Sequence, residues 1–164
     1  MNIKKFLGSS FIGGCAFSSA VSCSPATAVQ EGNFEAELLQ EFVQGGDLLK
    51  KFKDVAYGWA DSIADLFKEG GLNDSSKESF VLWLNRFLVC VAFFDRINYP
   101  INALNEFEYE WSEYFKNVLP DWFLKLEDQY NLGSIPEDCI PAEHRETYRF
   151  FVEKIKRAMG KYML

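Results

Sequence analysis

Apolar residues dominate the middle of the chain, from Ser79 to Ile97. The large side chains of this stretch recur at steps of three or four, the period of one helical face: Phe80, Trp83, Phe87, Cys90 and Phe94. Between Phe80 and Phe94 only Asn85 and Arg86 are strongly polar, so a helix here must be covered on most of its circumference. The alternative is a membrane span, but the run is shorter than about 20 apolar residues and carries Arg86 near its centre. We therefore predict a soluble core helix.

Amphipathic helices are predicted on both sides of this core helix. A first short helix starts at Asn33 and ends at Gly45-Gly46, and Asp47 caps the next one. The further helices are expected at Leu48–Lys68, Pro100–Leu119, Trp122–Leu132 and from Ala142 almost to Leu164. A loop with two prolines, Gly133–Pro141, precedes the last helix, and Gly70-Gly71 breaks the chain before the core helix.

Each of these helices carries one apolar side. In the first helix it comprises Phe34, Leu38, Leu39, Phe42 and Val43, and in the second Leu48, Phe52, Val55, Trp59, Ile63 and Phe67. The Pro100–Leu119 helix has Leu104, Phe107, Trp111, Tyr114 and Val118, and the last helix has Tyr148, Phe151, Ile155, Ala158 and Tyr162. Gly58 interrupts the second helix, which indicates a close neighbour or a bend at that point.

The fold class predicted from these patterns is all-α. We find no long alternating pattern of the kind that a half-buried strand would give. Four substantial helices with short connections favour an antiparallel helical bundle, with two shorter helices added. The expected organisation is a cleavable export signal at 1–22, a flexible tether at 23–32 and a single helical-bundle domain at 33–164.

The amino terminus resembles a bacterial export signal, because the basic Met1–Lys5 precedes the uncharged, apolar Phe6–Ser22. Three processing points compete. Ala20-Val21-Ser22-Cys23 and Ile12-Gly13-Gly14-Cys15 both resemble the lipobox that precedes a lipidated cysteine, and Ala26-Thr27-Ala28 matches ordinary signal peptidase. We prefer Cys23, which suits the length of the apolar region. The expected location is the cell envelope, membrane-anchored through this lipid or periplasmic.

Charge narrows the range of partners. The 164-residue chain has a formal net charge of −7, and without Lys4 and Lys5 it has 15 basic against 24 acidic residues. Such a surface repels phosphate backbones, so nucleic acid is not expected as a partner.

Catalytic and metal-binding patterns are mostly absent from the sequence. His144 is the single histidine, so neither a pair of Glu-x-x-His motifs nor a haem attachment motif is present, and no cofactor is predicted. We expect His144 on the surface of the last helix. Glu78-Ser79 resembles the Glu-Ser dipeptide of lytic transglycosylases, which would make Glu78 an acid, but the glycine-rich segment that follows in that family is missing.

Two clusters have both a binding and a structural interpretation. Glu106, Glu110 and Glu113 share one helical face, which predicts either an acidic interaction face for a basic partner or a hard cation, or a solvated surface. The four tryptophans either line a pocket for an apolar ligand or pack in the core: Trp59, Trp83, Trp111 and Trp122.

Cysteine usage gives one further hypothesis. If Cys15 is removed and Cys23 is lipidated, Cys90 and Cys139 remain as a pair in an oxidising compartment. A disulfide between them would close a loop of about 49 residues and stabilise the fold by on the order of 4 kcal/mol. The alternative is a buried free thiol at Cys90.

The function predicted best by these observations is an exported, lipid-anchored helical binding module without catalysis. The alternatives are a carboxylate-type hydrolase of envelope glycan and a carrier of a small apolar ligand. The identity of the protein partner and the existence of a homo-oligomer stay open at this point.

Overall fold

The protein is all-α in the part of the chain that a computed structural model describes, residues 25–131 and 133–159. The helices are α2 (Pro25–Val43), α3 (Leu48–Phe67), α4 (Asp74–Arg96), α5 (Ile101–Val118), α6 (Asp121–Gln129) and α7 (Arg145–Met159). Two short 3-10 turns, Glu137–Cys139 and Ala142–His144, lie between α6 and α7. The described ranges contain no strand.

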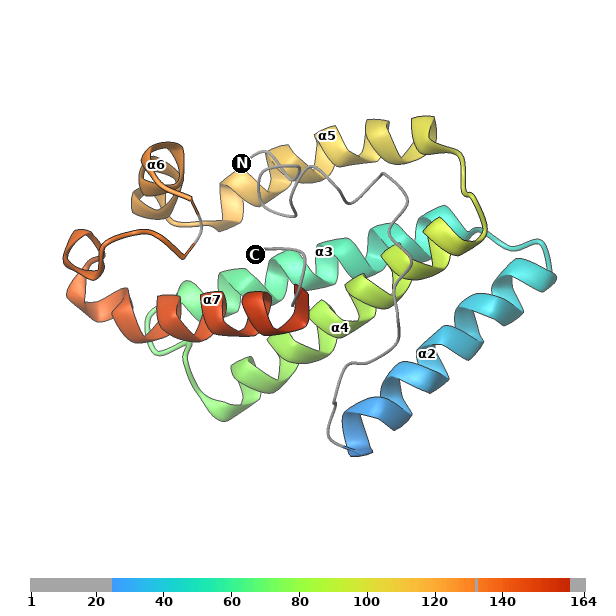
Figure 1. Cartoon of the computed structure of the whole chain (residues 1–164), viewed down its shortest axis with the longest axis horizontal. Coiled ribbons are helices and arrows are strands. Elements are labelled where there is room, and N and C mark those ends of the chain that lie inside the picture. Colours follow the sequence, from blue (N-terminus) through green and yellow to red (C-terminus); the bar gives the residue numbers. More distant parts are fainter. Residues whose placement is uncertain (1–24, 132, 160–164) are drawn as a thin grey trace.

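Helix α4 is the centre of the fold, as its composition predicts. Every residue from Ser79 to Phe94 is buried or half-buried. Helix α3 packs along one side of α4, while α2 and α7 pack on other parts of it, and α5 lies along α3 (Figure 1). Arg86 is accommodated because its guanidinium lies over the rings of Trp83 and Phe34, 5.1 and 5.5 Å from their centroids.

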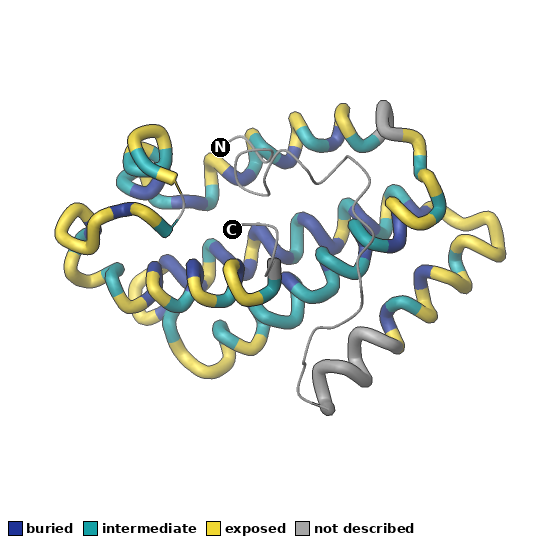
Figure 2. Tube along the Cα trace, in the orientation of Figure 1, coloured by how far each residue is buried: buried dark blue, intermediate teal, exposed yellow. Residues whose placement is uncertain are grey.

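Large aromatic rings fill the space between α3, α4 and α5. Trp59 stacks on Trp111 with ring centroids 5.8 Å apart, and both rings contact Phe87. The indole N–H of Trp111 donates a hydrogen bond to the carbonyl oxygen of Ala56 at 3.0 Å, so its polar atom is satisfied inside the core. The apolar row predicted for α3 is buried along its whole length (Figure 2).

The buried residues of α5 differ in part from the apolar side that the sequence predicted. Phe107 and Trp111 are buried as expected, but Phe115 and Leu119 complete the row in place of Tyr114 and Val118. Leu104, Tyr114 and Val118 are only half-buried. The buried residues therefore follow steps of four. Tyr114 lies at the border of the buried side, where its hydroxyl donates a hydrogen bond to Asp61.

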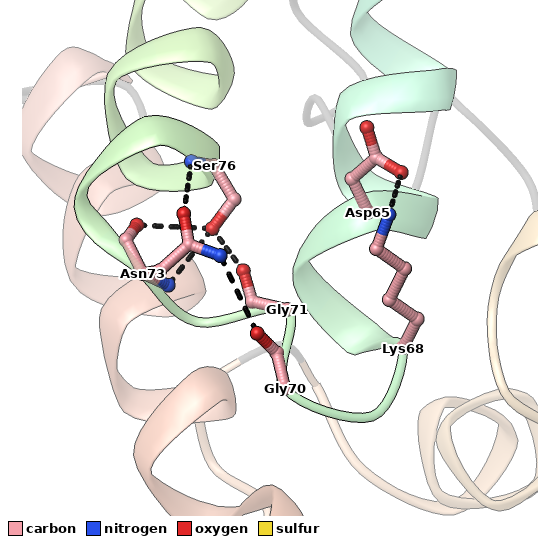
Figure 3. A network of polar contacts seen from close by, with 6 residues as sticks. All are labelled: Asp65, Lys68, Gly70, Gly71, Asn73 and Ser76. Carbon is pink, nitrogen blue, oxygen red and sulfur yellow. Dashed lines mark hydrogen bonds and ion pairs between the residues drawn. The ribbon is translucent and has the colours of Figure 1, made fainter.

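A capped turn connects α3 to α4 (Figure 3). Asn73 accepts a hydrogen bond from the backbone N–H of Ser76, and the Ser76 hydroxyl accepts one from the backbone N–H of Asn73, each at 3.0 Å. Gly70 has a φ of +69°, which favours glycine, and a side chain at Gly71 would collide with the carbonyl oxygen of Asp65. At the start of α3, Asp47 caps the helix as predicted by accepting a hydrogen bond from the backbone N–H of Lys50.

The ends of three helices differ from the sequence prediction. Helix α2 begins at Pro25, so Asn33 lies inside the helix and residues 25–32, expected in the tether, are helical. Proline suits the first helical position, and Ala26 and Ala28 favour continuation. Helix α6 ends at Gln129, and α7 begins at Arg145, after a 3-10 turn. The predicted signal segment lies outside the described residues. Among the described helices, none combines the length and the apolar composition needed to cross a membrane.

Candidate functional site

The carboxyl-terminal half of α2 presents an uncovered apolar surface. Leu39, Phe42 and Val43 are 52, 47 and 76% exposed, although the sequence pattern predicted them to face the core. Within the described residues, the other large apolar side chain of comparable exposure is Tyr109 on α5. The carboxyl-terminal half of α2 is coloured mainly as exposed in Figure 2. We call Leu39, Phe42 and Val43 the α2 strip.

The opposite side of α2 is attached to α4. Phe34 and Leu38 are buried, and the ring of Phe34 lies beneath the guanidinium of Arg86. Glu35 forms an ion pair with Arg96 of α4 at 2.7 Å. Phe42 contacts Phe93 edge-on, with ring centroids 6.2 Å apart, so this ring forms the border between the attached side and the α2 strip.

The sequence contained a signal for this uncovered surface that the prediction did not use. The apolar positions from Phe34 to Val43 span about half of the helical circumference, which is more than one neighbouring helix covers. A helix with two apolar sides is expected to be covered on both. Helix α4 covers one of them, and the side that carries Leu39 and Val43 is exposed. An exposed apolar surface of this kind is a candidate interaction site.

The predicted acidic residues lie on the exposed side of α5. Glu106, Glu110 and Glu113 are all exposed, and Glu113 forms an ion pair with Lys116 at 2.6 Å. The hydrogen bond between them and the charge of Lys116 lower the pKa of Glu113, and the same hydrogen bond and the charge of Glu113 raise the pKa of Lys116. Part of the predicted acidic face is therefore neutralised within the chain.

Two tyrosines lie beside these carboxylates, between α3 and α5. Tyr57 and Tyr114 meet edge-on at 4.9 Å between ring centroids. The hydrogen bond to Asp61, with burial, raises the pKa of Tyr114, and burial with the nearby charge of Glu110 raises the pKa of Tyr57. Both phenols are protonated at neutral pH, as ordinary tyrosines are, and these shifts move their ionisation further into the alkaline range.

His144 differs from its prediction as a surface residue of the last helix. It is half-buried in the Ala142–His144 turn and stacks on Trp122 with ring centroids 5.4 Å apart. The neighbouring Arg145 donates hydrogen bonds to the carbonyl oxygens of Glu137 and Ile140 at 3.1 Å. Arg149 pairs with the Glu137 carboxylate at 2.8 Å, so these basic residues hold the proline loop on α7.

The two cysteines of the disulfide hypothesis occupy different environments. Both are free thiols in the structure, with Cys90 buried in α4 and Cys139 exposed in its 3-10 turn. Burial raises the pKa of Cys90 to about 12, against the opposing charge of Lys51. A bridge between them stays a prediction about the oxidised protein.

The other residues that the sequence singled out are core residues, surface residues or residues outside the described part of the chain. Trp59 and Trp111 are buried against each other, and Glu78 is exposed in the second turn of α4. No group of three or more His, Cys, Asp and Glu side chains that could hold a metal ion occurs in the described part of the chain. Cys23, the predicted lipidation site, lies outside it.

The comparisons with known proteins add no functional assignment. The chain matches no protein-family model, no curated protein and no solved structure.

Proposed function

We propose that this protein is an exported, membrane-tethered helical module that acts by binding protein through the α2 strip, without catalysis. The observation that carries the proposal is the exposure of Leu39, Phe42 and Val43 on a helix whose other side is packed on α4. Exposed apolar side chains that cluster on one surface mark interaction sites more often than scattered ones do.

The proposed tether brings this surface close to a membrane. The preferred lipidation site, Cys23, precedes the first residue of α2, Pro25, by two positions. A lipid on Cys23 would therefore hold the amino-terminal end of α2 at the membrane surface. At about 1.5 Å per residue, Leu39 lies roughly 21 Å further along the helix, which keeps the α2 strip accessible to neighbouring proteins.

The finer fold assignment belongs to the same proposal. We assign α3, α4, α5 and α7 as the four main helices of an antiparallel bundle, with α2 and α6 added and a cleavable signal at 1–22. The short connections 68–73 and 97–100 support this arrangement, since helices joined by so few residues lie antiparallel to each other.

The proposal is tested with photo-crosslinking in the cell envelope. We place p-benzoylphenylalanine at position 43, in the α2 strip, and at exposed Glu153 on α7 as a matched control. The expected result is a discrete protein adduct from position 43 and none from position 153. Equal adducts from both positions, or none from position 43, would contradict a binding role for the α2 strip.

The tether is tested on the same preparation. The mass of the mature chain from the membrane fraction shows whether residues 1–22 have been removed and whether Cys23 carries diacylglycerol. An uncleaved, unmodified chain recovered from the cytosol would contradict the export part of the proposal.

A further inference from the structure

The outer side of α2 has the residue pattern of a helix-pairing seam. Ala36, Leu39 and Val43 are exposed and follow steps of three and four, the spacing of the a and d positions in a heptad. In the sequence the same steps extend backwards to Val29 and Gly32. The five positions carry no charge. We call Ala36, Leu39 and Val43 the α2 seam.

The charged residues of α2 lie mostly away from the α2 seam. The helix contains four glutamates and no basic residue, namely Glu31, Glu35, Glu37 and Glu41. In the heptad that the seam defines, Glu31, Glu37 and Glu41 fall outside the positions that flank a partner helix. Glu35 falls on a flank, but Arg96 of the same chain neutralises it at 2.7 Å. The opposite flank carries the uncharged, exposed Gln40.

We infer that the partner of the α2 seam is a second copy of this chain, bound as a parallel, two-fold symmetric pair of α2 helices. This inference rests on the proposed function and names the protein that the α2 strip binds. The seam is self-complementary, because an uncharged apolar row meets its own copy without bringing like charges together. In a parallel pair the neutralised Glu35 faces Gln40 of the other copy. Valine at an a position with leucine at a d position also favours two-stranded parallel pairs.

The proposed lipid anchor gives a reason for a parallel rather than an antiparallel pair. When both chains are anchored just before α2, their amino-terminal ends lie in the same membrane. With α2 directed away from the membrane, as the repulsion of its glutamates by anionic lipid favours, a two-fold axis along the membrane normal places both α2 helices side by side in one direction. In that orientation an antiparallel pair would require one anchor to leave the membrane.

Lipid is a weaker candidate for the same surface. Helices that lie flat on a membrane carry lysine and arginine on their polar side, which binds anionic lipid. Helix α2 carries four glutamates instead, and these would be repelled by such a surface. The apolar side of α2 therefore suits a protein surface better than a lipid one.

The size of the seam predicts that the membrane is needed for pairing. The described seam consists of Ala36, Leu39 and Val43, whereas stable protein interfaces bury about 1,200–2,000 Å² and involve roughly 20–30 residues on each partner. Confinement by short tethers raises the effective concentration of the second copy to about the millimolar range. The pair is therefore expected in membranes and is expected to dissociate when the anchored chain is diluted into detergent.

The test is cysteine crosslinking of the full chain in its membrane. In a parallel two-fold pair, positions 39 and 43 meet their own copies, whereas exposed Glu37 lies on another side of the helix. Leu39→Cys and Val43→Cys are compared with Glu37→Cys, each with Cys139→Ser and with the buried Cys90 retained. A disulfide requires Cα atoms within about 7 Å, so mild oxidation is expected to give at least about tenfold more dimer at positions 39 and 43 than at 37.

A second substitution distinguishes specific pairing of α2 helices from random collision of chains in the membrane. Leu39→Glu in the Val43→Cys chain places two like charges at the seam and is expected to lower the dimer yield to that of Glu37→Cys. Because Leu39 is half-exposed, the urea midpoint should stay unchanged. Equal yields at positions 37, 39 and 43 would overturn the inference. A photo-adduct between position 43 and a different protein would also overturn the inference, but the proposed function would stand. The absence of any adduct from position 43 would contradict both the inference and the proposed function.

Discussion

The ring of Trp83 lies directly against Gly58, where α4 packs on α3. A β-carbon built at position 58 would be 2.8 Å from a carbon of the indole ring, closer than real side chains approach. The glycine that weakens α3 as a helix is therefore required by the close approach of the two central helices. Of the two possibilities that the sequence indicated at Gly58, a close neighbour or a bend, the close neighbour is present.

Gly58→Ala is expected to destabilise the protein despite the better helix propensity of alanine. The substitution gains about 1 kcal/mol in propensity. Overpacking against the rigid ring costs roughly 1–3 kcal/mol, so the free energy of unfolding should fall by about 1 kcal/mol. Urea denaturation of both proteins measures the difference. In a Trp83→Ala chain the same Gly58→Ala change should stabilise, and a loss of stability in that background would contradict the explanation.

Substitution of Arg86 is expected to loosen α2 specifically. Its guanidinium lies between the rings of Trp83 in α4 and Phe34 in α2, and each such contact contributes about 0.5–1 kcal/mol. Arg86→Met should increase hydrogen exchange of the α2 amides while α3 stays protected. Lys53→Met is the matched control, because Lys53 lies over Phe107 of α5 and should leave exchange in α2 unchanged.

Removal of the α4 cap is expected to cost about 1 kcal/mol. Asn73→Ala deletes the side-chain acceptor of the Ser76 N–H and leaves that donor to water (Figure 3). The free energy of unfolding from urea titration should fall by that amount. Asn73→Asp keeps an acceptor oxygen at the same place and should retain most of the stability. An equal loss in both variants would show that the acceptor oxygen at position 73 is not the source of this stability.

The two thiols are expected to react at very different rates. Cys139 is exposed, whereas Cys90 is buried and its pKa is raised to about 12, so almost no Cys90 thiolate exists at pH 8. A thiol reagent should modify Cys139 within minutes and Cys90 only after unfolding. A protein from the oxidising compartment in which neither cysteine reacts after denaturation would establish the Cys90–Cys139 disulfide instead.

The raised pKa of Cys90 also predicts a pH dependence of stability. In the unfolded chain this thiol ionises near its ordinary pKa of about 8.5, while in the folded protein it stays protonated to about 12. The unfolded state therefore binds fewer protons in this window, and stability is lost as the pH rises from about 8.5 towards 12. Stability measured at pH 8 and pH 10.5 should fall less in Cys90→Ala than in the unsubstituted chain. Equal falls would contradict this assignment.

The sequence predicted the interior of this fold better than its surface. The rows of α3 and α4 follow from periodicity, because large apolar residues at steps of three or four have a single way to be buried. The buried side of α5 was predicted wrongly at Tyr114, because Tyr114 and Phe115 are adjacent aromatic residues that periodicity does not distinguish. In the structure Phe115 is buried, and Tyr114 lies at the border of the buried side, where its hydroxyl bonds to Asp61. The exposure of Leu39 and Val43 was missed, because periodicity shows which side is apolar but not how many neighbours are present to cover it.

Leu38 and Leu39 provide a matched test of that distinction. The two leucines are adjacent in α2, yet Leu38 is fully buried against the core and Leu39 is 52% exposed. Leu38→Ala should lower the free energy of unfolding of the region that includes α2 by about 2–5 kcal/mol, the usual cost of a buried leucine. Leu39→Ala should change it by no more than about 0.5 kcal/mol, as for other surface positions. Hydrogen exchange of the α2 amides and urea titration measure both values. Because a half-exposed leucine contributes so little to folding, folding gives no reason for its presence beside Val43 on the outer side of α2, whereas the proposed binding role does. A large loss of stability from Leu39→Ala in the isolated chain would mean that the α2 strip serves the fold itself.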